Sequence, residues 1–309
     1  MLRRLVYVVV ALASTMGCVS AASSKLASTE SALSGRHAPC GWEDHATYRH
    51  VIWIWMENRS YNQVLGRSGG AKNLASYANA CGVATNYDAI THPSLANYLA
   101  ATSGSTHGIK DDCDPSSCPV GGRSLFSQLD QSGAGWGAYA ENMRHPCDER
   151  SYDKYAARHN PAVYYSALRK SCRASDLAMG GTKGRFARHL AAGHLPGFVF
   201  VTPNLCDDGH DCSTATADSW LGSWLNRITA SRTYRNGSTV VFVTWDENDY
   251  SASSNQVATV VIGPTVTPGT RSHRHFTHYA LLRTTEQLLG VGYLRKAATA
   301  TSLRAAFNL

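Results

Sequence analysis

The stretch HVIWIWMEN, residues 50–58, decides the fold class of this chain. Val51 to Met56 are β-branched, aromatic or otherwise apolar and carry no charge, a pattern typical of a strand buried inside a sheet. The run stops at Glu57 and Asn58, so two polar side chains directly follow a buried strand. The stretch therefore predicts a buried strand that brings polar groups to one edge of its sheet.

Strands and helices alternate along the rest of the chain. Further strands are predicted at 82–87, 136–142, 198–203, 238–249 and 257–264. Helices are predicted at 71–81, 94–102, 124–133, 184–197, 217–231 and 278–290. This alternation predicts an α/β fold with a mainly parallel central sheet flanked by helices.

The composition fits one large folded domain. The chain has 309 residues and is 43% hydrophobic, which is enough for one core but not for two large domains with linkers. We predict a signal peptide at 1–21, a flexible lead-in at 22–45 and a single domain at 46–309.

The first residues have the pattern of an export signal. Arg3 and Arg4 precede a mostly apolar run at 5–19, and small residues at 19–21 offer a cleavage site. This pattern predicts a secreted, extracellular protein, with lipoprotein anchoring at Cys18 as a minor alternative. No later run reaches 18 apolar residues, so we expect no integral membrane span.

Eight of the nine cysteines follow residue 21, and an even number in an exported chain predicts up to four disulfides. Cys113–Cys118 and Cys206–Cys212 would each close a short loop, so these pairs are the first choice. The sequence leaves the other two pairs open, with Cys40–Cys81 and Cys147–Cys172 as one solution. No CxxC pattern is present to favour a zinc site.

The formal net charge is +7, and the basic residues are scattered rather than clustered in runs. Such a charge attracts anionic substrates mildly. The sequence has no nucleic-acid-binding motif and no interleaving of aromatic and basic residues, so nucleic acid is not an expected partner.

Polar residues suited to bind a ligand follow three predicted strands. They are Glu57 and Asn58 after the first strand, Asn204, Asp207, Asp208 and His210 after 198–203, and Asp246 and Glu247 after 240–245. Ligands in open α/β sheets bind at the carboxyl ends of the strands. Carboxylates, Asn oxygens and His nitrogens suit a divalent metal, whose identity and number the sequence leaves open.

The stretch THPSLANYLAATSG, residues 91–104, places Ser94 at the start of a predicted helix. A serine in this position is usually only a helix cap. It can also be a nucleophile, because the amides and dipole at a helix start stabilise an attacked phosphate. A metal beside the serine would favour the alkoxide, so the neighbouring ligand-type residues favour the nucleophile.

Several long motifs resemble one known family. VIWIWMENRSYNQVLG and THPSLANYLAATSG resemble the MENRSFD and HPS-x-PNYLA…SG segments of the bacterial phosphoesterase family, which contains acid phosphatases and phospholipases C. YAENM…PC, YDKYAARHNPAVYY, VTPNLCDDGHDC, VVFVTWDEND and HYALLRTTEQLLG follow in family order, so the resemblance spans 50–290. The family belongs to the alkaline-phosphatase superfamily. The resemblance implies an alkaline-phosphatase-like fold and makes 46–309 a single catalytic phosphoesterase domain.

The resemblance also implies roles for the polar residues. The catalytic residues are Ser94, His210 and His159. The substrate-binding residues are His92, Asn97, Asn204 and His278. The ligands of a divalent metal ion are Glu57, Asn58, Asp246, Glu247, Asp207 and Asp208.

Two details depart from a simple transfer of these roles. Ala96 stands where the family usually has Pro, which loosens the turn without removing any chemistry. His273 and His275 lie close to His278, so the sequence leaves open which of the three points into the site, with His278 favoured because it directly precedes the Tyr-Ala-Leu-Leu stretch of the last predicted helix.

The implied reaction begins when the Ser94 oxygen attacks phosphorus in line, while helix amides and the metal stabilise charge on the equatorial oxygens. A histidine, either His159 or His210, protonates the leaving oxygen, which is worth about 10²–10⁴-fold in rate. Water then releases phosphate from the phosphoserine.

Three functions fit this pattern. The first is a secreted acid phosphatase acting on small phosphomonoesters. The second is a phospholipase C acting on phospholipid, with phosphoinositide as a further possible substrate. Family phospholipases tend to carry extra C-terminal domains, and this chain stops about 20 residues after its last predicted helix, which favours the phosphatase.

The third function, a catalytically inactive secreted binding protein, is disfavoured by the intact Ser94 and acidic residues. Sulfatase chemistry is disfavoured because SLANY lacks the Cys/Ser-x-Pro-x-Arg pattern, and the oligomeric state is left open.

Overall fold

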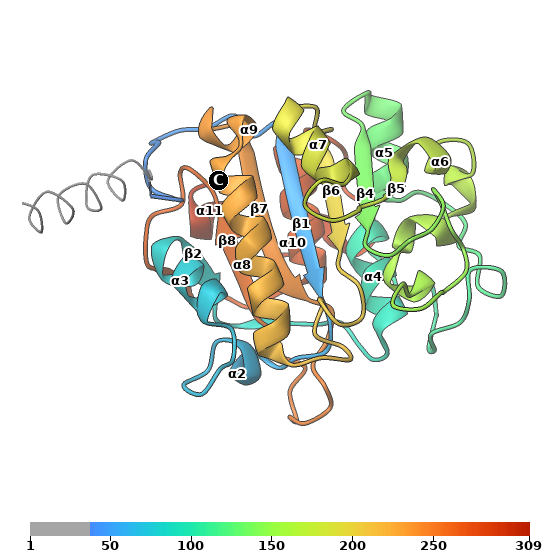
Figure 1. The fold of residues 1–309 in the computed structure, drawn as a ribbon, viewed down its shortest axis with the longest axis horizontal. Helices are drawn as coiled ribbons and strands as arrows, with labels where there is room; N and C mark the ends of the chain where they lie inside the picture. Colours follow the sequence, from blue (N-terminus) through green and yellow to red (C-terminus); the bar gives the residue numbers. More distant parts are fainter. Residues whose placement is uncertain (1–37) are drawn as a thin grey trace, which may run out of the picture. The chain divides into compact units, whose positions relative to one another are not determined.

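Strand β1 (His50–Met56) lies inside an eight-stranded sheet in the computed structural model, which describes residues 38–309 (Figure 1). Its side chains from Val51 to Met56 are fully buried. β1 pairs in parallel with β6 (Phe198–Thr202) on one side and with β7 (Thr239–Trp245) on the other. The prediction of a buried strand at this position is confirmed.

The strand order across the sheet is β5-β4-β6-β1-β7-β8-β2-β9. The remaining strands are β5 (Asp176–Ala178), β4 (Trp136–Ala140), β8 (Thr259–Ile262), β2 (Gly82–Ala84) and β9 (Thr270–Ser272). The strands from β5 to β7 run parallel, whereas β8 is antiparallel to both of its neighbours. No helix lies between β7 and β8, and without a crossover helix the chain returns in the opposite direction. The predicted α/β fold with a mainly parallel sheet is confirmed.

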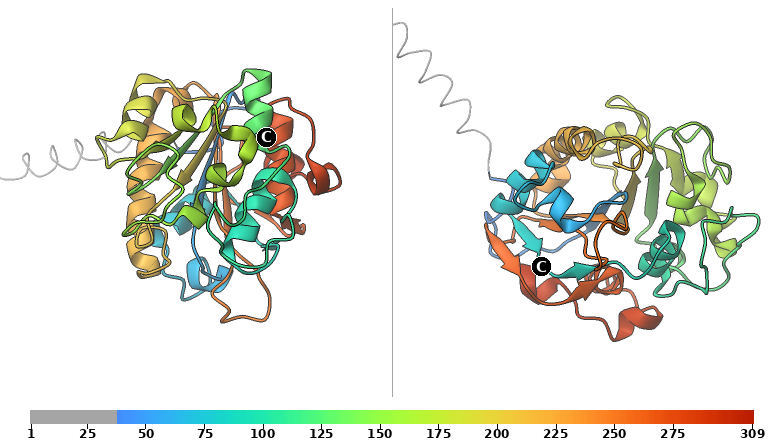
Figure 2. Two further views of the ribbon diagram at one scale, coloured as in Figure 1. Left: turned by 90° about the vertical axis from the view of Figure 1, so that its right-hand side faces the viewer. Right: turned by 90° about the horizontal axis from the view of Figure 1, so that it is seen from below.

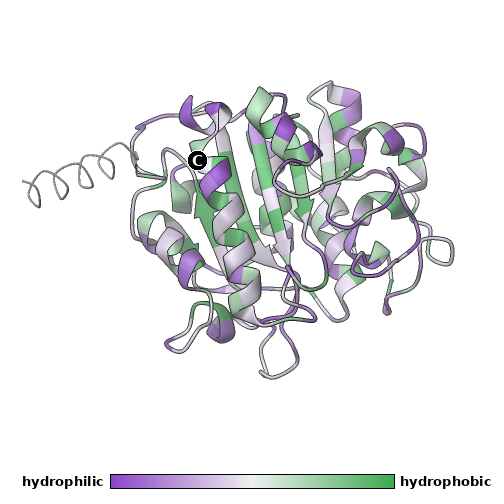
Figure 3. Cartoon of the chain, viewed as in Figure 1, coloured by the Kyte–Doolittle hydropathy of each residue, from purple (hydrophilic) through white to green (hydrophobic). Residues whose placement is uncertain are grey.

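Helices cover both faces of this sheet. The helices in front of it in Figure 1 are α3 (Lys72–Ala80), α7 (Arg185–Ala192) and α8 (Thr214–Ala230). Those behind it are α4 (Ser94–Ser103), α5 (Leu125–Ser132) and α10 (His278–Leu288). The side view in Figure 2 shows the sheet between the two layers, and Figure 3 shows hydrophobic residues concentrated on its strands. All six predicted helices are present.

The short elements are those that the sequence did not predict. They are α2 (Tyr61–Val64), α6 (Cys172–Ser175), α9 (Arg232–Arg235), α11 (Arg304–Phe307), η1 (Ala157–His159), η2 (Pro161–Tyr164), η3 (Ser166–Leu168) and η4 (Arg295–Ala298). A separate parallel pair joins β3 (Tyr87–Asp88) to β10 (Phe276–Thr277). Elements of two to four residues, like the missed β5 and β9, are too short to show a periodicity.

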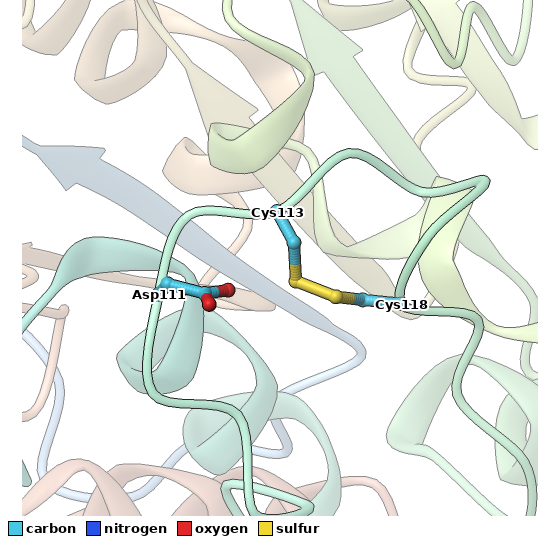
Figure 4. Close-up of side chains that lie close together, drawn as sticks. All are labelled: Asp111, Cys113 and Cys118. Carbon is cyan, nitrogen blue, oxygen red and sulfur yellow. A yellow bond between two sulfur atoms is a disulfide. The ribbon is translucent and has the colours of Figure 1, made fainter.

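Four disulfides join all eight cysteines of the described residues. The pairs are Cys40–Cys81, Cys113–Cys118, Cys147–Cys172 and Cys206–Cys212. The predicted pairings are confirmed, including the two that the sequence left open, and such bonds persist in oxidising compartments. Asp111 lies beside one disulfide (Figure 4) and Asp176 beside another, but these bonded sulfurs offer no thiolate to a metal.

The predicted signal peptide at 1–21 lies outside the described residues, as does most of the lead-in predicted at 22–45. At the described end of that lead-in, Cys40 forms a disulfide with Cys81. The Trp42 amide also donates to the carbonyl oxygen of Pro264 at 3.0 Å.

The folded part of the chain therefore begins before residue 46, and Pro39–Leu309 form one compact unit. Within residues 38–309, none of the helices is both long enough and apolar enough to cross a membrane.

One acidic side chain lies deep inside this unit, away from the ends of the central strands. Asp176, the first residue of β5, is fully buried, and its Oδ2 accepts a hydrogen bond from Asn160 Nδ2 at 2.8 Å. Burial raises the pKa of Asp176 to about 7, and repulsion from Asp148 adds to the effect. The folded protein therefore holds the Asp176 proton to a higher pH than the unfolded chain does.

We predict that this carboxyl group makes the protein less stable as pH rises. Between about pH 4 and pH 7 the folded state binds the extra proton, so the free energy of unfolding falls by on the order of 4 kcal/mol across that window. In Asp176→Asn the amide oxygen still accepts from Asn160 but cannot ionise. Urea denaturation from pH 4 to pH 8 should show the variant gaining stability relative to wild type up to pH 7, and no further gain above it. A difference that is constant, or that grows on acidification, would contradict this assignment.

Candidate functional site

Three adjacent strands end at the same edge of the sheet and bring the predicted polar residues together. Glu57 and Asn58 follow β1, while Asp246 and Glu247 follow β7. The Asn58 backbone amide donates to Asp246 Oδ1 at 3.3 Å, and its side-chain amide donates to Glu247 Oε1 at 3.1 Å. From the loop after β6, the Asp208 carbonyl accepts from the Glu57 amide at 3.0 Å. The parallel sheet has thus placed residues that are far apart in the sequence into one site.

Ser94 opens helix α4 beside these carboxylates. Pro93 occupies the cap position, and the side chain of Ser94 caps nothing. Its hydroxyl instead donates to Glu57 Oε2 at 3.1 Å, and the residue is buried. The helix-cap interpretation of Ser94 is therefore wrong, and the hydroxyl faces the acidic residues.

Glu57, Asp208, Asp246 and Glu247 form what we call the acidic cluster. All four are at most 1% exposed. Burial raises the pKa of Asp246 to about 7, with hydrogen bonds, including one from Ser94, acting against it. Burial and then repulsion from Asp246 raise the pKa of Glu247 to about 9.

The other two carboxyl groups behave in the same way. Burial, Asp246 and Asp208 all raise the pKa of Glu57, and burial is the main cause of the raised pKa of Asp208. Within residues 38–309, the ion pairs of the cluster are with histidines rather than with lysine or arginine. The four carboxyl groups therefore resist ionisation until a positive charge is added beside them.

Five buried atoms of the site have no hydrogen-bond partner among the described residues. They are Asn58 Oδ1, His92 Nδ1, His159 Nε2, Asp208 Oδ2 and Asp246 Oδ2. Buried polar atoms without a partner are rare, and each one calls for a physical explanation. Carboxylate and amide oxygens of this kind are ligands that divalent cations prefer, so the residues present fit such an ion.

Two of the predicted catalytic histidines lie together beside the cluster. His159 is buried, with Nε2 3.5 Å from Glu57 Oε1 and Nδ1 3.5 Å from Asp208 Oδ2. Burial lowers its pKa well below the usual range, so the ring is neutral. The His210 ring lies 5.8 Å from that of His159, is partly exposed, and has Nδ1 2.6 Å from Asp211 Oδ1.

His92, two residues before Ser94 in the chain, also lies beside the acidic cluster. Its Nδ1 is 2.9 Å from Glu247 Oε2, and its side chain is 28% exposed. Of the predicted substrate-binding residues, His92 is therefore the one that lies beside the acidic cluster with part of its surface open to solvent.

Of His273, His275 and His278, it is His278 that points into the protein, where it contacts the backbone of Asp246 rather than the side chains of the acidic cluster. It is fully buried, with Nδ1 3.1 Å from the Tyr87 hydroxyl and Nε2 2.7 Å from the Asp246 carbonyl oxygen. His273 contacts Thr85 and His275 contacts Asp88, both at the surface. Both ring nitrogens of His278 are engaged, so its contacts hold the backbone at Asp246 in place.

The Asn97 side chain is also fully hydrogen-bonded within the protein. Its Oδ1 accepts from the backbone amides of Ile90 at 2.9 Å and Thr91 at 3.1 Å. Its Nδ2 donates to the Thr91 carbonyl at 2.8 Å and to Glu247 Oε2 at 3.1 Å. Asn97 is fully buried and braces the loop that leads into Ser94.

Asn204 and Asp207 are not brought to the acidic cluster. The Asn204 amide donates to Asp207 Oδ2 at 2.8 Å and to Glu141 Oε2 at 3.1 Å. These residues form a separate group with Glu141 at the start of the loop closed by Cys206–Cys212, so only Asp208 of the predicted Asp207–Asp208 pair reaches the cluster.

Three residues of the site were missed in the sequence. The Tyr98 hydroxyl donates to Glu57 Oε1, and its ring stacks on His159 at 5.5 Å. Asp112 Oδ1 accepts from the Leu95 amide at 2.9 Å, and Asp112 Oδ2 lies 3.5 Å from Arg158 Nε. Tyr98 could have been found four residues after Ser94, on the same face of the helix. Asp112 and Arg158 carried no sequence signal.

Known proteins resemble this chain over most of its length. A phosphatidylinositol-3-phosphatase from Mycobacterium tuberculosis is 34% identical over 267 residues, which cover 83% of this chain and 83% of that protein. An acid phosphatase from Aspergillus fumigatus is 27% identical over 257 residues, covering 80% of this chain. The chain spans 56% of the length of this fungal relative.

A solved structure of an alkaline-phosphatase-superfamily protein from Vibrio parahaemolyticus matches the fold with a TM-score of 0.57 at 12% identity, over 84% of this chain and 72% of that one. The model of the Phosphoesterase family matches residues 71–292, a range that includes Ser94, Asp208 and the Asp246–Glu247 pair. The predicted family resemblance is confirmed, and the chain belongs to the Phosphoesterase family.

Proposed function

We propose that this protein is a secreted phosphomonoesterase of the acid-phosphatase kind, with Ser94 as its nucleophile. The observation that carries the proposal is the Ser94 hydroxyl at the start of α4, which donates to Glu57 Oε2 at 3.1 Å within a buried acidic cluster. The relatives named acid phosphatase support the reaction class. The signal peptide predicted at 1–21 and the four disulfides support secretion.

The first half of the reaction forms a phosphoserine. The Ser94 proton passes toward the Glu57 carboxylate, the Ser94 oxygen bonds to phosphorus, and the bond between phosphorus and the leaving oxygen breaks. His159 is buried and neutral, whereas the His210 side chain is 33% exposed and reaches solvent. We therefore assign protonation of the leaving oxygen to His210 and positioning of the Glu57 and Asp208 carboxylates to His159. Water then attacks phosphorus and releases inorganic phosphate and free Ser94.

A divalent cation fits the acidic cluster as its resident ion. Asn58, Asp208 and Asp246 would hold it, because each presents a buried oxygen without a hydrogen-bond partner, and the Glu57 and Glu247 carboxylates beside them would complete the ligand set. When bound, the ion would supply positive charge that favours the Ser94 alkoxide and attracts the phosphate. Asp207 is turned toward Asn204, which leaves it outside this proposed ligand set.

A second candidate substrate class rests on one relative. The Mycobacterium tuberculosis protein is named a phosphatidylinositol-3-phosphatase, which is a phosphomonoesterase acting on a lipid. Phosphoinositide is therefore a second candidate substrate, and phospholipase C activity on a phosphodiester is the further alternative. Side-by-side assays with a small phosphomonoester, a phosphoinositide monophosphate and phosphatidylcholine distinguish the three.

Replacing the nucleophile should abolish the reaction without unfolding the protein. We expect Ser94→Ala to lower the turnover of every phosphoric ester by more than about 10³-fold, because no other hydroxyl can form the phosphoserine. Ser103→Ala is the matched control, since it removes a buried hydroxyl from the same helix at a point where it contacts Leu99 and His107. Steady-state rates and circular dichroism report activity and folding. Retention of more than a tenth of wild-type turnover by Ser94→Ala would rule out the nucleophile assignment.

Removing charge from the acidic cluster should lower metal content together with activity. Asp246→Asn and Glu57→Gln keep the shape of each side chain but weaken its affinity for a cation, so we expect each purified variant to hold less metal than wild type. Asp111→Asn, which changes an exposed carboxylate, should keep wild-type metal content. Elemental analysis and chelation measure the outcome. Full activity of metal-free wild-type protein after prolonged chelation would refute the proposed role of the metal ion.

A further inference from the structure

An exposed aromatic side chain stands beside the acidic cluster. The loop of residues 246–258 joins β7 to β8 and extends from the sheet edge at which β1 and β7 end (Figure 1). Tyr250 in this loop is 65% exposed, the highest value among the large hydrophobic residues described as exposed. The two others, Tyr152 and Tyr293, are each covered by an arginine, with the guanidinium carbon 3.8 Å and 4.4 Å from the ring centre. No arginine covers the Tyr250 ring in this way among the described residues, so its exposure needs a different explanation.

The Tyr250 ring packs against a residue of the site. Its centroid lies 4.0 Å from that of His92, and the two ring planes differ by 28°, so the rings are stacked. His92 in turn lies 2.9 Å from Glu247 and stands two residues before Ser94. One face of Tyr250 is therefore fixed to the wall of the site, and the rest of its surface is open to solvent.

The loop holds Tyr250 in a backbone conformation that tyrosine rarely adopts. Its φ is +62°, in the left-handed region that side chains with a Cβ disfavour. Asn248 maintains this geometry, because its Oδ1 accepts from the Tyr250 amide at 2.8 Å and its Nδ2 donates to the Ser254 carbonyl at 2.6 Å. Unfavourable backbone geometry that the surrounding structure enforces is concentrated at functional positions.

The loop is also anchored to the segment that leads into Ser94. The Asn255 side-chain amide donates to the Thr91 carbonyl at 2.9 Å, and Gln63 Nε2 donates to Asp249 Oδ2 at 2.6 Å. The position of Tyr250 relative to Ser94 is therefore set by hydrogen bonds on both sides of the loop rather than by the exposed tip alone.

We propose that Tyr250, backed by His92, is a stacking platform for the leaving group, and that the enzyme prefers phosphomonoesters of ring-bearing alcohols. The proposal rests on the phosphomonoesterase function proposed above. With the phosphate at Ser94, a ring attached through the leaving oxygen would reach the open surface of Tyr250. An aromatic face favours flat aryl rings and the C–H faces of cyclic polyols, whereas an acyclic chain covers it poorly.

The test compares ring-bearing and acyclic substrates on matched variants. The substrates are p-nitrophenyl phosphate, inositol monophosphate and glycerol 3-phosphate. The variants are Tyr250→Ala, Tyr250→Phe and, as a control with an exposed tyrosine elsewhere, Tyr293→Ala. We expect Tyr250→Ala to raise KM about tenfold for at least one ring-bearing ester and less than about twofold for glycerol 3-phosphate, the size of effect that one aromatic contact provides. Tyr250→Phe and Tyr293→Ala should behave like wild type on all three.

The two ring-bearing substrates identify the kind of ring that is bound. An effect confined to p-nitrophenyl phosphate assigns the platform to aryl esters, and one confined to inositol monophosphate assigns it to cyclic polyols. Equal changes in KM for ring-bearing and acyclic esters, no change in any of them, or an equal loss in Tyr250→Phe would each overturn the platform.

Binding without turnover separates this proposal from the proposed function. In the Ser94→Ala background, calorimetry with phenyl phosphate and glycerol 3-phosphate reports the platform even if wild type hydrolyses neither ester. Weaker phenyl phosphate binding on adding Tyr250→Ala supports the platform, and unchanged binding refutes it. Absence of hydrolysis by the wild type would refute only the phosphomonoesterase function.

Discussion

The structure around Ser94 depends on one electrostatic constraint, which is the burial of four carboxyl groups at the ends of neighbouring strands. Two unit charges 4 Å apart repel by about 4 kcal/mol at the effective dielectric of a protein, and desolvating each carboxylate costs several kcal/mol more. The protein offsets part of this through neutral donors, with Ser94 and Tyr98 on Glu57 and with Asn58 and Asn97 on Glu247. A hydrogen bond to a charged group contributes about 1.5–3 kcal/mol, so these donors lessen the repulsion without removing it.

The cost of ionising these four carboxyl groups bears on the chemistry. A phosphate monoester is itself an anion, and the ionised cluster without added positive charge repels it. The neighbouring histidines do not supply that charge, because burial keeps His159 neutral and desolvation lowers the pKa of His92. A bound divalent cation would offset part of the negative charge of the ionised cluster and would also engage Asp246 Oδ2 and Asn58 Oδ1, which otherwise lack partners. If the cluster holds the proposed cation, the same unfavourable burial that weakens the fold would prepare a site for the ion and for the phosphate.

The parts of the site that depend on sheet geometry could be predicted from the sequence. The apolar run of β1 and the polar residues that follow β1 and β7 correctly place Glu57 near Asp246, because parallel strands end at one edge. The parts of the site that depend on loop conformation could not be predicted from the sequence. Asn204 and Asp207 follow β6 as predicted, yet the loop closed by Cys206–Cys212 turns them toward Glu141. Likewise, periodicity shows that His278 begins a helix but not that both of its ring nitrogens are already bonded.

The difference between strand ends and loops also separates the residues proposed for the reaction from those proposed to select the substrate. Glu57 and Asp246 are fixed by the backbones of buried, paired strands, and such positions change little without damage to the core. Tyr250 and Asp112 instead lie on loops, next to Ser94 but outside the sheet, where replacement need not disturb the core packing. A Phosphoesterase member can therefore keep the serine and its acidic cluster while its loops adapt to a different leaving group. On the functions proposed above, the loop from β7 to β8 would select the leaving group, while the strand ends would hold the groups that carry out phosphate transfer.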